Sequence, residues 1–283
     1  MDLAFNIIRK CNKSCEYCYL DMNGESLSLD EIKKVVSELE NVRKVTITGG
    51  EPLIHPQIFD IINFLNKKTD GINLLTNGIE LTDENTTKLE NYDIELFITY
   101  NTSNEILLKN MKTANKKGIP INIHHVLTED SLEHLEEICS DLDFAKKILF
   151  LYPTDMGDGK VKMYGPGKWN SILDRAIPIS EKHINTFYEP AFVKSDELDG
   201  VEICPSGKDI FIDSDGKSYP CCLLTDTMDG KSELKPVHAN PKDCPFISKY
   251  EAEDGYERIC PLLISDVSRK TLSFPSRLDD SYD

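Results

Sequence analysis

The sequence predicts an α/β protein with a mostly parallel sheet, followed by a small cysteine-rich hairpin region. Strand-like and helix-like segments alternate from residue 3 to residue 176, and the helix-like segments carry apolar residues at i, i+3, i+4 and i+7. This alternation corresponds to about six βα units, which join into a parallel sheet by right-handed crossovers. More than half of the nine cysteines follow residue 203, which predicts the separate hairpin region.

The expected elements follow one another in a regular order. Strands are expected at residues 3–8, 43–48, 72–76, 94–99, 121–127 and 148–152. Helices are expected around residues 32–39, 58–65, 83–89, 107–114, 131–142 and, more weakly, 169–176. The segment from Ser28 to Glu31 matches a capping box, so the first helix should begin there. Glycine and proline punctuate residues 153–199, which is typical of a loop and a connector.

Three cysteines share one short segment near the N-terminus. Cys11, Cys15 and Cys18 have C-x3-C-x2-C spacing and follow the first expected strand. Iron–sulfur clusters are held by cysteine thiolates, usually four, so a loop with three leaves one iron for a ligand that is not protein. The alternative is a zinc knuckle, but structural zinc sites favour a second cysteine pair, and none lies nearby.

A second pattern follows the expected strand at residues 43–48. Gly49, Gly50, Glu51 and Pro52 come directly after it. Two glycines at the carboxyl end of a strand allow the backbone to approach a ligand closely. The carboxyl ends of parallel strands meet at one edge of a sheet, so this segment and the cysteine loop should lie together.

These two patterns together resemble the radical S-adenosylmethionine (radical SAM) family. The resemblance implies a partial (β/α)6 barrel and a 4Fe–4S cluster on the three N-terminal cysteines, whose free iron binds the amino and carboxylate groups of SAM. It also implies cofactor contacts for Tyr17 with the adenine, for Gly49–Pro52 with the methionine amino group, and for Thr99 with the ribose. Thr76 and Asn77 could reach SAM or substrate, although Asn77-Gly78 is also an ordinary turn sequence.

The later cysteines suggest a second centre. Ser214-Asp215-Gly216 predicts a hairpin turn that brings Cys204 and Cys221 to the same end. The spacing resembles the opening of SPASM and Twitch domains, which hold auxiliary 4Fe–4S clusters: eleven residues separate Cys204 from Gly216, and four residues separate Gly216 from Cys221. The resemblance implies one auxiliary cluster, and the expected ligands are Cys204, Cys221, Cys244 and Cys260.

Two further questions concern the same cysteines. Cys222 is set aside as a ligand because adjacent residues of a strand point in opposite directions. Cys139 lies in a helical run and is expected to be a buried small hydrophobe. A four-cysteine zinc site, or three protein ligands with an open iron, remain alternatives for the second centre.

The linear organisation follows from these motifs. We expect the barrel at residues 1–178, a connector at 179–200, the auxiliary-cluster region at 201–265 and a tail at 266–283. The chain has no run of about 18 apolar residues and no export signal, so we expect no membrane span and a cytoplasmic location. The net charge of −17 disfavours nucleic-acid binding, which needs basic surface.

The expected function is enzymatic. By the resemblance, one electron from a donor such as ferredoxin or flavodoxin cleaves SAM, and the resulting 5′-deoxyadenosyl radical abstracts hydrogen from a substrate. A peptide or protein side chain is the expected substrate. The alternative is oxidation of a small molecule such as an aminosugar alcohol, favoured by a chain that starts directly at its first strand. A more remote alternative is an electron-transfer protein without SAM chemistry.

Overall fold

The structure is a computed structural model that describes residues 1–15, 18–100, 104–154, 161–180, 182–183, 186–189, 191–195, 204, 206–240, 244, 247 and 255–260. The chain divides into two compact units. The first comprises Met1–Ile123, Phe144–Lys146 and Ser206–His238, and the second comprises His124–Asp143, Lys147–Pro205 and Ala239–Asp283. The hairpin after residue 206 therefore groups with the first strands, whereas the sequence-based division into four linear segments remains a prediction.

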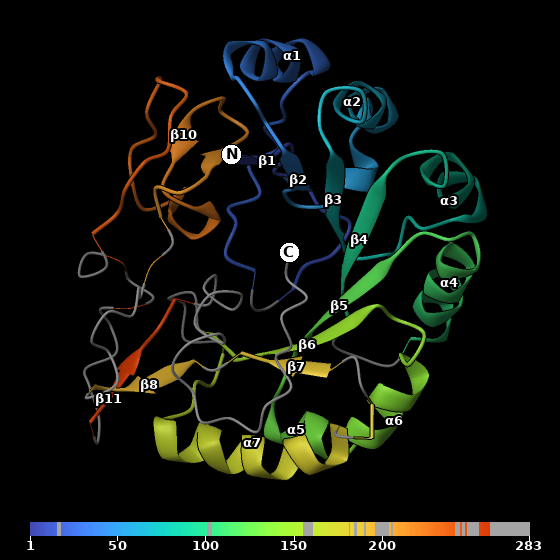
Figure 1. Ribbon diagram of the computed structural model, residues 1–283, viewed down its shortest axis with the longest axis vertical. Helices are drawn as coiled ribbons and strands as arrows, with labels where there is room; N and C mark the ends of the chain where they lie inside the picture. Colours follow the sequence, from blue (N-terminus) through green and yellow to red (C-terminus); the bar gives the residue numbers. More distant parts are fainter. Residues whose placement is uncertain are drawn as a thin grey trace. The chain divides into compact units, whose positions relative to one another are not determined.

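Parallel strands and helices alternate in the first unit. The strands are β1 (Asp2–Asn6), β2 (Lys44–Thr48), β3 (Gly71–Thr76), β4 (Ile94–Thr99) and the first half of β5 (Ile121–Val126). The helices are α1 (Leu29–Glu38), α2 (Ile58–Leu65), α3 (Asp83–Leu89) and α4 (Glu105–Lys116), with a short 3-10 helix, η1 (Pro52–Ile54). The strand order is β1-β2-β3-β4-β5, and α1 to α4 lie along one side of these strands (Figure 1). The predicted α/β class is confirmed.

The capping box predicted at Ser28 is present. The Ser28 hydroxyl accepts a hydrogen bond from the Glu31 N–H at 3.3 Å, and the Glu31 carboxylate accepts one from the Ser28 N–H at 2.7 Å. These bonds satisfy N–H groups that have no partner inside the helix. The Ser28 hydroxyl also donates to the Glu31 carboxylate at 2.7 Å, and this bond, together with the one from the Ser28 N–H, lowers the pKa of Glu31 below its ordinary value.

Burial alternates along the strands of the first unit. The fully buried positions include Val45, Ile47, Ile72, Leu74 and Leu96, and their alternation places them on one face of the sheet. We infer that this is the face packed against the apolar stripes of α1 to α4. The residues between them are only partly buried and lie on the opposite face of the sheet. That face carries polar side chains, because Asn73 donates to Thr46 at 3.5 Å and Asn122 donates to Glu95 at 3.1 Å.

The hairpin predicted around Gly216 is confirmed, and it extends the sheet of the first unit. Strand β9 (Ile210–Ile212) pairs antiparallel with β10 (Ser218–Tyr219), and Gly216 has the positive φ of 76° that such a turn requires. β9 also pairs parallel with β1, with Phe5 opposite Ile212. This pairing joins residues about two hundred positions apart and was not predicted from the sequence.

The second unit contains the second half of β5, β6 (Lys147–Leu151) and β7 (Thr186–Tyr188), in the order β5-β6-β7. Its helices are α5 (Glu129–Leu132), α6 (Leu135–Asp141) and α7 (Pro166–Ser180), which lie on one side of β6 and β7 (Figure 1). A separate pair of antiparallel strands is formed by β8 (Phe192–Lys194) and β11 (Tyr256–Arg258). Among the helices that the structure describes, none is long and apolar enough to cross a membrane.

Three sequence expectations in this unit need correction. The helix expected at residues 131–142 is two helices, because Thr128 caps an earlier start and His134 leaves the helical backbone region with φ −113° and ψ 9°. The weak helix around Trp169 is longer than expected and begins with Pro166, a residue suited to a first helical turn. Strands β7 and β8 lie where only a connector was expected.

Candidate functional site

The predicted site residues of the first unit gather at one edge of its sheet. The cysteine loop follows β1, Gly49 follows β2, Asn77 follows β3, and Thr99 is the last residue of β4. These strands are parallel and in register, so their carboxyl ends lie together. The sequence prediction of a shared edge is therefore confirmed for these strands. Tyr17 lies outside the described residues.

The glycine segment packs directly against the backbone that leads into Cys11. The Gly50 N–H donates to the Ile8 carbonyl at 2.7 Å, and the Glu51 N–H donates to the Lys10 carbonyl at 2.9 Å. A Cβ at Gly50 would lie 2.6 Å from the Lys10 carbonyl carbon and would overlap its oxygen. Glycine is thus required at this position because the chain's own backbone passes so close. The sequence had suggested a different reason, the close approach of a ligand.

Gly49 is constrained in the same way. Its φ is 142°, in the region that favours glycine. A Cβ there would lie 2.6 Å from both the Asn6 side-chain oxygen and the Ile8 carbonyl oxygen. Both glycines therefore fix the distance between the carboxyl end of β2 and the start of the cysteine loop.

Glu51 connects the glycine segment to β3. Its carboxylate is fully buried and accepts hydrogen bonds from the Leu53 N–H at 3.0 Å, the Thr76 hydroxyl at 2.8 Å and the Asn77 N–H at 2.7 Å. Burial raises the pKa of Glu51 above its ordinary value, and the three hydrogen bonds oppose that rise. The carboxylate therefore holds Thr76 and Asn77 in place.

Asn77 reaches the cysteine loop. Its side-chain N–H donates to the Cys11 sulfur at 3.6 Å and to the Asn12 side-chain oxygen at 2.8 Å. The Lys13 N–H donates to the same sulfur at 3.4 Å. These two hydrogen bonds orient the Cys11 sulfur.

The three N-terminal cysteines fit a cluster loop. The Cys18 N–H donates to the Cys15 carbonyl at 3.1 Å. Desolvation raises the pKa of the Cys18 thiol, and the neighbouring thiols of Cys15 and Cys11 raise it further. All nine cysteines are among the described residues, and none forms a disulfide. Cysteine thiolates from one segment are the donor type that an iron–sulfur cluster uses, although these three side chains do not surround a single metal position in the structure.

The later cysteines are divided between the two units. Cys221 and Cys222 belong to the first unit, whereas Cys204, Cys244 and Cys260 belong to the second. The argument that set Cys222 aside is wrong, because β10 ends at Tyr219 and residues Cys222–Leu224 form a 3-10 helix, η3. Among the described residues, no three acidic, histidine or cysteine side chains are arranged around a single metal ion. The four-cysteine ligand set remains a prediction.

Cys139 is confirmed as a buried residue of α6, with no exposed surface. Burial raises the pKa of its thiol to about 12, so the sulfur keeps its proton at neutral pH. Reactive cysteines have lowered pKa values and partial exposure, and Cys139 has neither.

The sequence analysis did not predict a buried ionic network that lies beside the cysteine loop. Arg9, two residues before Cys11, pairs with Asp213 at 2.6 Å and with Asp226. Arg9 and Asp213 are each 4% exposed. Both aspartates come from the hairpin region, and only the pairing of β9 with β1 brings them close. The sequence carried no pattern that could have indicated this network.

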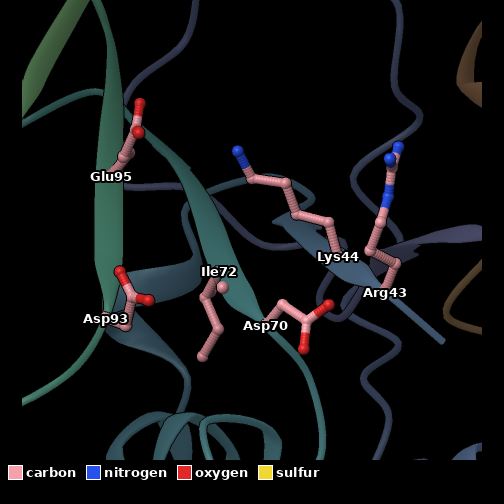
Figure 2. A pocket seen from close by; sticks show the side chains of 7 residues that line it. Arg43, Lys44, Asp70, Ile72, Asp93 and Glu95 are labelled. Atoms are coloured by element: carbon pink, nitrogen blue, oxygen red, sulfur yellow. The ribbon is translucent and has the colours of Figure 1, made fainter. Parts of the chain in front are cut away.

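A cavity of about 250 Å³ lies at the opposite edge of the sheet, at the amino ends of β2, β3 and β4. Its lining residues are mostly charged: Arg43, Lys44, Asp70, Gly71, Ile72, Asp93 and Glu95. Figure 2 shows the carboxylates of Asp70 and Asp93 on either side of Ile72. Glu95 is bound by Lys146 at 2.8 Å, which contributes to a lowered pKa of the carboxyl group although its partial burial opposes this. The cavity is separate from the edge that carries the cysteine loop.

Comparisons with known proteins agree with this site. The model of the radical SAM superfamily matches residues 5–142. A probable GTP 3′,8-cyclase of Methanococcus maripaludis is 30% identical, over 79% of this chain and 85% of the relative.

Two solved structures share the fold. SuiB of Streptococcus suis bound to the precursor peptide SuiA has a TM-score of 0.67 at 16% identity, over 81% of this chain. This chain covers 61% of that SuiB chain, so it spans less than two thirds of it. Native anSMEcpe with bound AdoMet and the Cp18Cys peptide has a TM-score of 0.62 at 18% identity, over 86% of both chains. These two structures confirm the predicted partial barrel with a C-terminal region. The family model and the 30% identical relative show that the chain belongs to the radical SAM superfamily.

Proposed function

We propose that Cys11, Cys15 and Cys18 hold a 4Fe–4S cluster that binds SAM. The observation that carries the proposal is the contact between the cysteine loop and the carboxyl ends of β2 and β3, made through Gly50, Glu51 and Asn77. When bound, the cluster supplies the electron that cleaves SAM and so generates the radical that abstracts hydrogen from substrate. The chain's own residues orient the thiolates: Asn77 and Lys13 donate to the Cys11 sulfur.

Replacement of all three cysteines tests this proposal. The variant with Cys11→Ala, Cys15→Ala and Cys18→Ala should form no 5′-deoxyadenosine with SAM and dithionite, measured by chromatography after anaerobic reconstitution. It should also lose about four irons, the content of one cluster. Cys139→Ala is the matched control, because that thiol is buried in α6, and this variant should keep both properties. Undiminished SAM cleavage in the triple variant would refute the proposal.

For the C-terminal region we propose one auxiliary 4Fe–4S cluster on Cys204, Cys221, Cys244 and Cys260. The support is the resemblance to SPASM and Twitch spacing together with the fold shared with SuiB and anSMEcpe. Cys222→Ser should keep about eight irons per chain, whereas Cys221→Ser should keep about four. Four irons with one zinc in the unmodified protein would favour the zinc alternative.

We further propose a peptide or protein side chain as the substrate. Two structures with this fold were solved with bound peptides, the precursor SuiA and the Cp18Cys peptide. The sequence relative named as a probable GTP 3′,8-cyclase points instead to a nucleotide substrate. The residues of this chain must therefore decide between a peptide and a nucleotide.

The sheet face away from the helices suits a peptide better than a nucleoside triphosphate. Thr46, Asn73, Glu95 and Asn122 line this face across β2 to β5 in the first unit. They are neutral or acidic; Lys146 is paired with Glu95, and Lys44 lines the same cavity as that carboxylate. Triphosphates are held by arginine and lysine, whereas amides and hydroxyls pair with peptide backbone groups.

A direct comparison of substrates tests this choice. Reduced protein with SAM should produce no more 5′-deoxyadenosine when GTP is added than without it. Short peptides encoded beside the gene should raise the yield and should change in mass. Stimulation by GTP, with a new nucleotide product, would overturn the peptide proposal and leave the SAM site unaffected. Stimulation by an aminosugar alcohol would support the small-molecule alternative instead.

A further inference from the structure

The turn that follows the hairpin contacts both ends of the cysteine loop. The Asp226 carboxylate pairs with the Arg9 guanidinium, just before Cys11, through one oxygen. Its other oxygen accepts a hydrogen bond at 3.0 Å from the N–H of Asp21, just after the loop. The Arg9 guanidinium also donates to the Asp21 carbonyl at 3.3 Å. One carboxylate therefore connects the residues on either side of the cysteine loop and holds its two ends together.

Arg9 is itself held rigidly by the hairpin. It pairs with Asp213 at 2.6 Å, and both side chains are almost fully buried. Asn6 donates to the second Asp213 oxygen at 2.5 Å, so that carboxylate is satisfied on both sides. A buried arginine with two carboxylate partners has a fixed position, because moving it would leave a buried charge without a partner.

A second contact joins the same turn to the loop. The Tyr19 side chain lies beside the Cys222 side chain. Tyr19 directly follows Cys18, and Cys222 lies in η3, four residues before Asp226. The loop is thus contacted at its base by Asp226 and beside its third cysteine by Cys222.

We propose that residues Cys221–Asp226 form a strap that positions the three-cysteine loop for its cluster. The strap makes the C-terminal hairpin part of the first cluster's site, beyond any auxiliary metal that this region holds. Asp226 and Cys222 are positioning residues, since they act through Arg9, Asp21 and Tyr19. The expected effect of the strap on SAM binding rests on the proposed cluster site. The expected effect on the stability of the loop does not depend on it.

Two conservative substitutions remove the strap contacts without changing size. Asp226→Asn removes the charge that pairs with Arg9, and Tyr19→Phe removes the hydroxyl of the side chain that lies beside Cys222. Asp215→Asn is the matched control, because Asp215 lies in the same hairpin and accepts from Lys217 N–H and the Tyr219 hydroxyl at 3.0 Å, away from the loop. The full-length protein is used throughout, and circular dichroism checks that each variant is folded.

The first measurement does not depend on a cluster. Hydrogen exchange of peptides that cover residues 10–21 should be about tenfold faster in Asp226→Asn than in the unmodified protein, the factor that corresponds to one lost charge-assisted hydrogen bond. Tyr19→Phe should give a smaller increase, and Asp215→Asn should give none. Equal exchange in Asp226→Asn and the control would overturn the proposal.

The second measurement tests the consequence for SAM. In reconstituted protein, the SAM-induced change in the electron paramagnetic resonance spectrum of the reduced cluster should need a higher SAM concentration in Asp226→Asn, with iron content unchanged. Faster exchange with an unchanged SAM requirement would overturn the positioning role. A protein whose loop exchange responds as expected but whose spectrum never responds to SAM would contradict the proposed function and leave the strap in place.

Discussion

The side-chain amide of Asn77 donates a hydrogen bond to the Cys11 sulfur across 3.6 Å, from the loop after β3 to the loop after β1. The Asn77 backbone N–H is bound at 2.7 Å by the Glu51 carboxylate, so the amide is held in place on its other side. Hydrogen bonds to cluster sulfurs stabilise the more negative, reduced state and raise the reduction potential. Asn77 is therefore expected to set the potential at which SAM cleavage begins.

Asn77→Ala should lower the midpoint potential of the first cluster by roughly 40 mV, the equivalent of about 1 kcal/mol for a one-electron couple. A redox titration followed by electron paramagnetic resonance measures it. Asn91→Ala is the control, because Asn91 makes comparable hydrogen bonds at the exposed end of α3. An unchanged potential in Asn77→Ala, with SAM binding intact, would show that the N–H···S bond has no electronic effect.

Gly50→Ala should impair cluster binding through the protein backbone. The added Cβ would overlap the Lys10 carbonyl, so the segment before Cys11 must move, at a cost of about 1–3 kcal/mol. Iron at the first site and thermal stability should both fall. Gly167→Ala in α7 is the matched control, because a Cβ there meets nothing within 4 Å and alanine favours helix. Normal iron content in Gly50→Ala would mean that the loop tolerates the displacement.

The local patterns of this chain could be interpreted from sequence because they depend on short spacings. The cysteine run, the glycines after β2 and the capping box at Ser28 each fall within about ten residues, and the βα alternation follows from side-chain periodicity. The placement of Asn77 beside the cysteine loop then follows from parallel strands whose ends share an edge.

The contacts that were missed depend on distant pairing. Arg9 and Asp226 are 217 residues apart, and they meet because β9 adds to the free edge of β1. β9 has only three residues, too few for a periodicity that would indicate its partner. The strand argument that set Cys222 aside failed for a local reason instead, because the expected strand gives way to η3, and the ligand assignment itself stays a prediction.

Glu51→Gln should destabilise the protein more strongly as the pH falls. The folded-state pKa of Glu51 is raised above its ordinary value near 4.5, so the folded protein binds this proton more tightly than the unfolded chain. Protonation of Glu51 therefore increases the free energy of unfolding as the pH falls through its raised folded-state pKa. Glutamine does not titrate and gives no such increase. At neutral pH the variant should lose about 1–3 kcal/mol, because its amide N–H groups face other donors.

Urea unfolding of the unmodified protein and of Glu51→Gln at pH 8 and pH 5 measures this difference. Glu84→Gln provides a control of opposite sign, because Lys88 lowers the pKa of Glu84. The loss in free energy of unfolding caused by Glu84→Gln should be smaller at pH 5 than at pH 8, whereas the loss caused by Glu51→Gln should be larger. A difference for Glu51→Gln that stays constant with pH would mean that burial does not raise its pKa.

Arg258 occupies in the second unit a place like that of Arg9 in the first, because each lies two residues before a cysteine. Its guanidinium is buried beside Glu189 at 3.3 Å and lies over the Tyr152 ring at 4.5 Å. It also donates to the carbonyls of Ala191 at 2.8 Å and Ile259 at 2.9 Å. Burial raises the pKa of Glu189, and the arginine opposes that rise.

Arg258→Lys should destabilise the second unit by about 3 kcal/mol, because lysine keeps the charge but cannot supply the planar set of donors. Trp169 reports this unit specifically, since it is the chain's only tryptophan and packs edge-on to Tyr152 with ring centroids 5.0 Å apart. Its fluorescence in a urea titration should therefore shift to a lower midpoint. Lys182→Ala removes an exposed pair with Glu136 and should cost less than about 1 kcal/mol. Equal midpoints for the two variants would show that the Arg258 network contributes no more than a surface ion pair.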